Sequence, residues 1–156
     1  MFKKYANLFK DLKIAYAPYS KDFLGPGDRR RFCFFARELG IKFDQFEKGK
    51  DYDLVIFSST SDLNCIDKLK QKKSKIVLDL VDSYLIKTPL HKDLIRYIGR
   101  SYLQKRFKNV FLPIKYTNYL KKYISKADAI VCSTEKQLQE IKRFNPNVHI
   151  ILDNMD

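Results

Sequence analysis

The sequence predicts an α/β fold: a Rossmann-like three-layer sandwich with a mostly parallel β-sheet. Short, nearly continuous apolar runs recur along the chain, as in strands that are covered on both faces. Stretches with helical spacing separate most of these runs, which is typical of parallel strands joined by right-handed crossovers. The length of 156 residues and the hydrophobic content of 45% fit one core, so we expect residues 1–156 to form a single domain.

Each strand and helix can be placed from its own residues. The strands are expected over residues 13–17, 41–46, 53–58, 75–80, 129–132 and 148–152. Three helices are expected between them, over residues 28–39, 61–72 and 133–144. The residues that can cap these helices are Asp28 for the first, Ser61 or Asp62 for the second, and Ser133 or Thr134 for the third. Gly40 suits the left-handed position that ends the first helix.

A long insertion follows the fourth strand. Nearly fifty residues separate Leu80 from Ala129, which is too many for one loop and one crossover helix. Residues 91–108 and 116–126 both have helical spacing, and Pro113 lies between them. We therefore expect a basic amphipathic helix pair to be inserted here.

The charge of the chain is concentrated in this insertion. The chain has a net charge of +13, from 31 Lys and Arg against 18 Asp and Glu. Residues 85–126 hold eleven of the basic residues and one acid, Asp93, which leaves +10 within 42 residues. Lys92, Arg96 and Arg100 are spaced four apart and form one ridge of a helix.

A basic, aromatic helix pair suits an anionic membrane surface, where cations reach the headgroup phosphates and aromatic rings enter the interface. The residues expected to bind the membrane are Lys92, Arg96, Arg100, Lys105 and Arg106. Two alternatives stay open: a solvated face over an ordinary core helix, and a nucleic-acid partner. No RNA-binding motif, zinc finger or convincing helix-turn-helix accompanies the charge.

Several classes of protein are disfavoured. No stretch approaches the roughly 20 apolar residues of a membrane-spanning helix, and the lysine-rich N-terminus lacks the apolar region of a signal peptide. The three cysteines are far apart and fit neither a disulfide framework nor a paired metal motif. No cluster has zinc-ligand spacing, so no metal site is expected. We expect a cytoplasmic protein, with peripheral attachment to the inner face of the cell membrane as a further hypothesis.

A glycine-containing loop follows the first strand. Gly25 and Gly27 precede a helix whose first turn carries Arg29, Arg30 and Arg31. Backbone amides at such a turn can approach an anion, and arginines bind phosphate or carboxylate groups. In the plainer interpretation the glycines only form a tight turn. A dinucleotide fingerprint with Glu47 as its acid is weak, because Arg30 stands where a third glycine belongs.

Polar residues also follow the fourth and fifth strands. Asp79 and Asp82 lie at the carboxyl end of the fourth strand, the edge at which open α/β sheets bind ligands. A carboxylate there can act as a general base. Equally, Asp79 can pair with a nearby arginine or cap a turn. Ser133, Thr134 and Glu135 follow the fifth strand, where helix capping is the favoured interpretation.

Taken in order, these segments resemble the N-terminal domain of GT-B glycosyltransferases, in particular the GT4-like (group 1) family. The segments are KIAYAP, GPGD leading into RRRFCFFARELG, YDLVIFSS, KIVLDLVDSY and ADAIVCSTEKQLQEIKRFNPNVHIILDNMD, which together span residues 13–156. The family's two glycines are commonly adjacent, whereas Pro26 separates them here.

The resemblance implies transfer of a sugar from a nucleotide-sugar donor, which is a substrate rather than a cofactor, to a lipid-linked or glycan acceptor. By this analogy Gly25, Gly27 and Arg29 face the donor diphosphate. Asp82 is the candidate catalytic residue on the acceptor side, and the basic insertion docks on the membrane. The family's second, donor-binding domain is not in this sequence, so we expect a missing C-terminal domain or a partner subunit, and no activity of this chain alone.

Two other hypotheses remain. The first is a non-enzymatic α/β module that binds nucleic acid or a protein partner through its basic helices. The second is a small nucleotide-dependent oxidoreductase that uses Gly25, Gly27 and Glu47.

Overall fold

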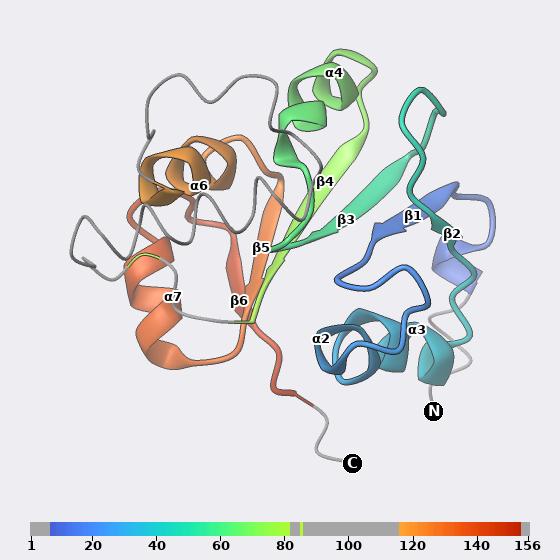
Figure 1. Ribbon diagram of the computed structural model, residues 1–156, viewed down its shortest axis with the longest axis horizontal. Coiled ribbons are helices and arrows are strands. Elements are labelled where there is room, and N and C mark those ends of the chain that lie inside the picture. Colours follow the sequence, from blue (N-terminus) through green and yellow to red (C-terminus); the bar gives the residue numbers. More distant parts are fainter. Residues whose placement is uncertain (1–6, 82–84, 86–115, 154–156) are drawn as a thin grey trace.

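One six-stranded sheet forms the centre of the molecule, in the strand order β2-β1-β3-β4-β5-β6 (Figure 1). The computed structural model describes residues 7–81, 85 and 116–153. The strands are β1 (Ile14–Ala17), β2 (Asp44–Gln45), β3 (Leu54–Ser58), β4 (Lys75–Leu80), β5 (Ala129–Cys132) and β6 (Val148–Ile150). Every pairing between neighbours in this sheet is parallel, which confirms the expected fold class.

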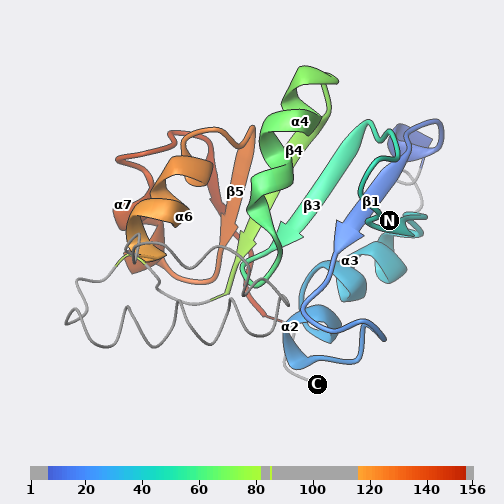
Figure 2. The same cartoon turned by 45° about the horizontal axis from the view of Figure 1, so that its top comes forward.

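Helices cover both faces of the sheet and make it the middle of three layers (Figure 2). The helices are α2 (Pro26–Arg29), α3 (Phe32–Leu39), α4 (Ile66–Gln71), α6 (Tyr116–Ile124) and α7 (Glu135–Ile141), with short 3-10 turns at Asn7–Phe9 and Leu63–Cys65. Leu69 of α4, Leu120 of α6 and Ile141 of α7 share one apolar cluster. On the opposite face, Phe32 of α3 packs against Tyr16 and Ile56. The two apolar clusters explain why the strands have almost no polar face.

The helix expected over residues 28–39 is broken in two. Arg31 lies between α2 and α3 with φ −118° and ψ −120°, far from helical geometry. Asp28 lies within α2 and not at its start, so the prediction that Asp28 caps this helix is wrong. Gly40 ends α3 with φ 67°, the left-handed conformation that the sequence predicts.

Other elements keep their places but are shorter than expected. β2 pairs only at Asp44 and Gln45, because Ile41 and Phe43 pack into the apolar cluster under α3. The helix expected over residues 61–72 starts as the 3-10 turn Leu63–Cys65, and Asp62 caps that turn by accepting the Asn64 amide. At the end of the chain, β6 covers three of the five residues expected to be a strand.

One helix of the expected basic pair lies among the described residues. The expected second helix is α6, whereas the first, over residues 91–108, lies outside the described part. Leu120, Tyr123 and Ile124 of α6 are buried in the core. Lys122 and Lys126 contact the Asp67 carboxylate at the surface. The apolar face of α6 therefore belongs to the core, and these two lysines lie at the surface.

The three cysteines are free thiols, and Cys132 is the buried one. Burial raises the pKa of the Cys33 thiol to about 12, and the charge of Asp28 adds to this effect. Cys33 is therefore a protonated packing residue at neutral pH.

We predict that Thr134→Ala lowers the free energy of unfolding by about 1 kcal/mol. The Thr134 hydroxyl accepts the Gln137 amide at 3.2 Å, and the Gln137 side chain accepts the Thr134 amide at 3.0 Å. The substitution removes one half of this capping box at the start of α7. Urea unfolding measures the effect, and Thr134→Ser is the matched control because it keeps the hydroxyl. Equal stability of the Ala and Ser variants would contradict the capping role.

Candidate functional site at the carboxyl edge of the sheet

The strand order reverses direction between β1 and β3, and the carboxyl ends of these two strands are the candidate site. β2 lies on one side of β1, whereas β4, β5 and β6 extend from β3 on the other side. Loops leave such a point in opposite directions, and open parallel sheets bind ligands there. The Tyr19 hydroxyl bridges the two loops, 3.0 Å from Oγ of Ser59. Burial raises the pKa of Tyr19 to about 12, so this hydroxyl stays protonated at neutral pH.

Asp28 holds the loop that follows β1. Its fully buried carboxylate accepts hydrogen bonds from the Tyr16 hydroxyl at 2.8 Å and from the Tyr19 amide at 2.8 Å. Ser20 donates its amide and its hydroxyl to the same carboxylate, each at 2.9 Å. Burial raises the pKa of Tyr16, and the charge of Asp28 raises it further. The loop thus binds an internal anion, the carboxylate of Asp28.

The two glycines of this loop are required by close packing. A Cβ atom at Gly27 would lie 2.7 Å from a ring carbon of Tyr19. A Cβ atom at Gly25 would lie 2.9 Å from the Asp28 carboxylate, and the Gly25 amide donates to Oγ of Ser20 at 2.8 Å. Arg29 is exposed beside them, at the end of α2. This packing gives the glycines a structural role, while their approach to a donor diphosphate stays a prediction.

Arg31 is the most highly connected side chain of the edge. Its guanidinium is buried, with 1% of the side chain exposed. Nε donates to Oδ1 of Asp79 at 2.9 Å, and Nη2 binds the same oxygen. Nη1 donates to Oγ of Ser133 at 2.7 Å, to the carbonyl of Ile151 at 2.7 Å and to Oδ1 of Asp153 at 2.8 Å. One side chain therefore joins the ends of β4, β5 and β6 to the start of α3.

The electrostatics of this cluster keep Arg31 charged. Burial alone lowers the pKa of Arg31, but the hydrogen bonds and charges of Asp79 and Asp153 outweigh it, so the pKa is raised. Burial raises the pKa of the Asp79 carboxyl, and Arg31 opposes that shift. A buried carboxylate next to a fixed guanidinium is suited to hold the edge in shape rather than to exchange protons.

An apolar cavity of about 210 Å³ adjoins this pair, between α3 and the sheet. Its lining runs from Ile14 and Leu54, at the starts of β1 and β3, to Asp79 and Ile151. Phe35 of α3 also lines it. The cavity offers an apolar chain a place beside the polar edge.

The structure settles part of what the sequence left open. Asp79 pairs with an arginine, as one of the two interpretations held, and Thr134 caps α7. Glu47 follows β2, and its carboxylate accepts a hydrogen bond from Lys50 at 2.9 Å. The remaining predicted residues lie outside the described part of the chain: Asp82, Lys92, Arg96, Arg100, Lys105 and Arg106.

Sequence reasoning missed that Arg31 is the arginine that pairs with Asp79, and it missed Tyr19 and Asp153. An acid inside an otherwise apolar strand, as Asp79 is, signals a buried partner. That signal does not say which of three consecutive arginines is the partner.

Among the described residues, no three His, Cys, Asp or Glu side chains are placed to hold a metal ion. Comparison of the chain with models of known families, with curated proteins and with solved structures finds no match. The fold and the edge geometry therefore have to be interpreted from the chain itself.

We predict that Arg31→Met destabilises the protein by about 3–5 kcal/mol, because it leaves Asp79 buried without its partner. Urea unfolding measures the loss. Arg37→Met is the matched control: Arg37 is 73% exposed, and its loss should cost less than about 0.5 kcal/mol. Adding Asp79→Leu to Arg31→Met should restore part of the stability. If Arg31→Met and Arg37→Met lower the free energy of unfolding by the same small amount, the cluster does not stabilise the fold.

Proposed function

We propose that this chain is the acceptor-side domain of a glycosyltransferase that moves a sugar from a nucleotide-sugar donor to a lipid-linked or polysaccharide acceptor. One observation carries the proposal: Tyr19, Asp28 and Arg31 join the end of β4 and the loops after β1, β3, β5 and β6 into one polar network at the carboxyl edge. The ordered likeness of the sequence to GT-B N-terminal domains supports the same conclusion.

The donor side of the proposed site is the glycine loop. Arg29 is exposed next to Gly25 and Gly27, and in this proposal its guanidinium binds a diphosphate on the solvent side of the loop. A bidentate arginine contact suits phosphate oxygens. A second domain, or a partner subunit, supplies the remaining donor contacts in this proposal, and Asp82 acts on the acceptor side.

The acceptor side combines the apolar cavity with the basic insertion. The cavity beside Asp79 and Ile151 supports an acceptor with an apolar portion. No helix among the described residues is long and apolar enough to cross a membrane. The proposed docking therefore rests on the sequence of residues 85–126, whose charge of +10 suits anionic headgroups at the inner face of the cell membrane.

We predict that nucleotide sugars shift the backbone amide NMR signals of Gly25, Gly27 and Arg29. UDP-glucose, GDP-mannose and dTDP-glucose are titrated separately, and at least one should bind weakly through this loop. Arg29→Gln should weaken that binding about tenfold, because a hydrogen bond to a charged group contributes about 1.5 kcal/mol or more. Arg37→Gln is the control variant, and a separate titration with NAD tests the oxidoreductase alternative. Unmoved loop signals with every nucleotide sugar at millimolar concentration would overturn the donor side of the proposal.

We predict that Lys92→Glu, Arg96→Glu and Arg100→Glu together weaken binding to anionic vesicles more than 100-fold. Each basic residue near such a surface contributes about 1 kcal/mol, and the change reverses three of them. Cosedimentation with phosphatidylserine vesicles measures the effect. Lys136→Glu, Lys142→Glu and Arg143→Glu form the control, because they change the net charge equally at other exposed positions. An equal loss of vesicle binding in both triple variants would favour the non-enzymatic binding module. Preferential binding of RNA over vesicles would favour it as well.

A further inference from the structure

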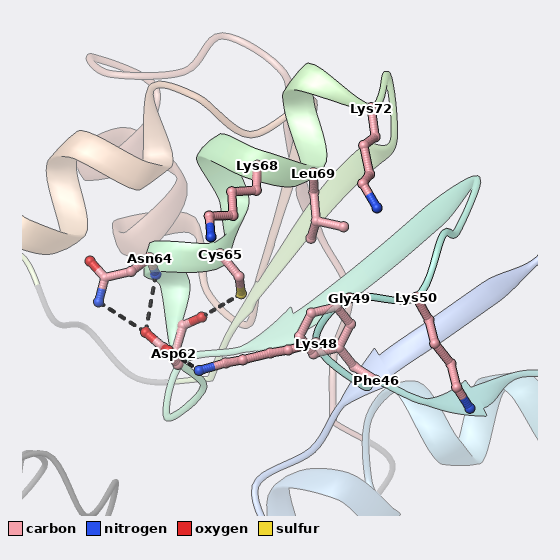
Figure 3. A pocket seen from close by; sticks show the side chains of 10 residues that line it. All are labelled: Phe46, Lys48, Gly49, Lys50, Asp62, Asn64, Cys65, Lys68, Leu69 and Lys72. Carbon is pink, nitrogen blue, oxygen red and sulfur yellow. Dashed lines mark hydrogen bonds and ion pairs between the residues drawn. The ribbon is translucent and has the colours of Figure 1, made fainter.

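A second pocket lies on the α4 side of the sheet, between α4 and the connection from β2 to β3 (Figure 3). Its volume is about 350 Å³, within the usual size of a small-molecule site. None of the edge residues Tyr19, Asp28, Arg31 or Asp79 lines it. Whatever binds here is therefore independent of the carboxyl edge and of the function proposed for it.

One part of the pocket is apolar and flat. Phe46 lines it, and its ring lies 5.2 Å from that of Phe57 and 5.8 Å from that of Tyr52, measured between centroids. Leu69 of α4 is 5% exposed and lines the opposite wall. The Cys65 thiol donates to the carbonyl of Asp62 at 2.8 Å. These groups form an ordered surface against which a flat ring can stack.

The remaining lining is rich in positive charge. The lysines that line the pocket are Lys48 and Lys50 from the β2–β3 connection and Lys68 and Lys72 from α4. Asp62 is the one acid in the lining. In Figure 3, Lys72 extends from α4 toward the connection, Lys68 extends toward Asn64 and Cys65, Lys48 reaches across to Asp62, and Lys50 points away. Lys68 and Lys72 are four residues apart, so they share one face of the helix.

The ion pairs around the pocket leave these lysines available. Lys48 binds Asp62 at 2.8 Å with 62% of its side chain exposed, and Lys72 binds Asp51 at 2.5 Å with 47% exposed. The Lys72–Asp51 pair is exposed on both sides and contributes about 0–1 kcal/mol, so a stronger anion can replace Asp51. The Asp62 side chain is 14% exposed, so a phosphate would bind Lys48 beside this carboxylate. Among the described residues, Lys68 has no acidic partner.

We propose that this pocket binds a phosphate ester that carries a flat apolar ring. The ring lies on Phe46 and Leu69, and the phosphate is bound by Lys48, Lys68 and Lys72. A phosphate dianion forms shorter and stronger hydrogen bonds with ammonium groups than a neutral acceptor does. The volume of the pocket accepts one ring with its phosphate.

Calorimetric titration with phenyl phosphate tests the proposal, in about 150 mM salt so that the net charge of the chain is screened. Lys68→Ser with Lys72→Ser should weaken binding at least tenfold. Lys136→Ser with Lys142→Ser removes the same charge from other exposed positions and should change binding less than twofold. Melting temperatures show that both double variants are folded. Equal weakening in the two would mean general charge attraction and would overturn the proposal.

Two further measurements on the unmodified protein test whether the ring of the ligand contributes to binding. Inorganic phosphate should bind at least tenfold more weakly than phenyl phosphate, and equal affinity would contradict the ring-binding surface. Phenyl phosphate should also slow the alkylation of Cys65, which lines the pocket, by N-ethylmaleimide. An unchanged rate at Cys65 would place the ligand elsewhere and refute the site.

Discussion

A buried guanidinium has five donors and no acceptor, so it can be buried only where several acceptors converge on it. Arg31 finds them at the ends of three strands: Asp79 of β4, Ser133 after β5, and Ile151 and Asp153 after β6. Losing any of these partners leaves charge in a site where water cannot replace it. The relative positions of the strand ends at the carboxyl edge therefore depend on this one side chain.

The local backbone follows from the same requirement. The break between α2 and α3 lies at Arg31, the residue whose side chain turns inward. The short helix α2 that precedes the break carries Asp28, which turns toward the loop after β1 and accepts its amides. The glycine loop and the arginine cluster are thus two consequences of one interruption, and together they shape the candidate site.

The sequence predicted those features that depend on local pattern. The apolar runs gave the positions of β1, β3, β4 and β5, because buried parallel strands tolerate few polar residues. It did not predict the break at Arg31, because residues 28–39 contain no glycine or proline that would mark a break. At the break, Arg31 binds Asp79, a partner 48 residues away in the sequence. β2 was overestimated for a related reason: Ile41 and Phe43 are apolar because they pack under α3, not because they pair in the sheet.

The central claim, that a rigid Arg31 cluster defines the edge, is tested most directly by NMR of the arginine side chains. We predict that the Nε proton of Arg31 exchanges with water many times more slowly than that of the exposed Arg37. We also predict separate Nη signals for Arg31, because its two terminal nitrogens have different partners. A rapidly exchanging Nε proton with averaged Nη signals would show that the cluster is open in solution and would contradict the account.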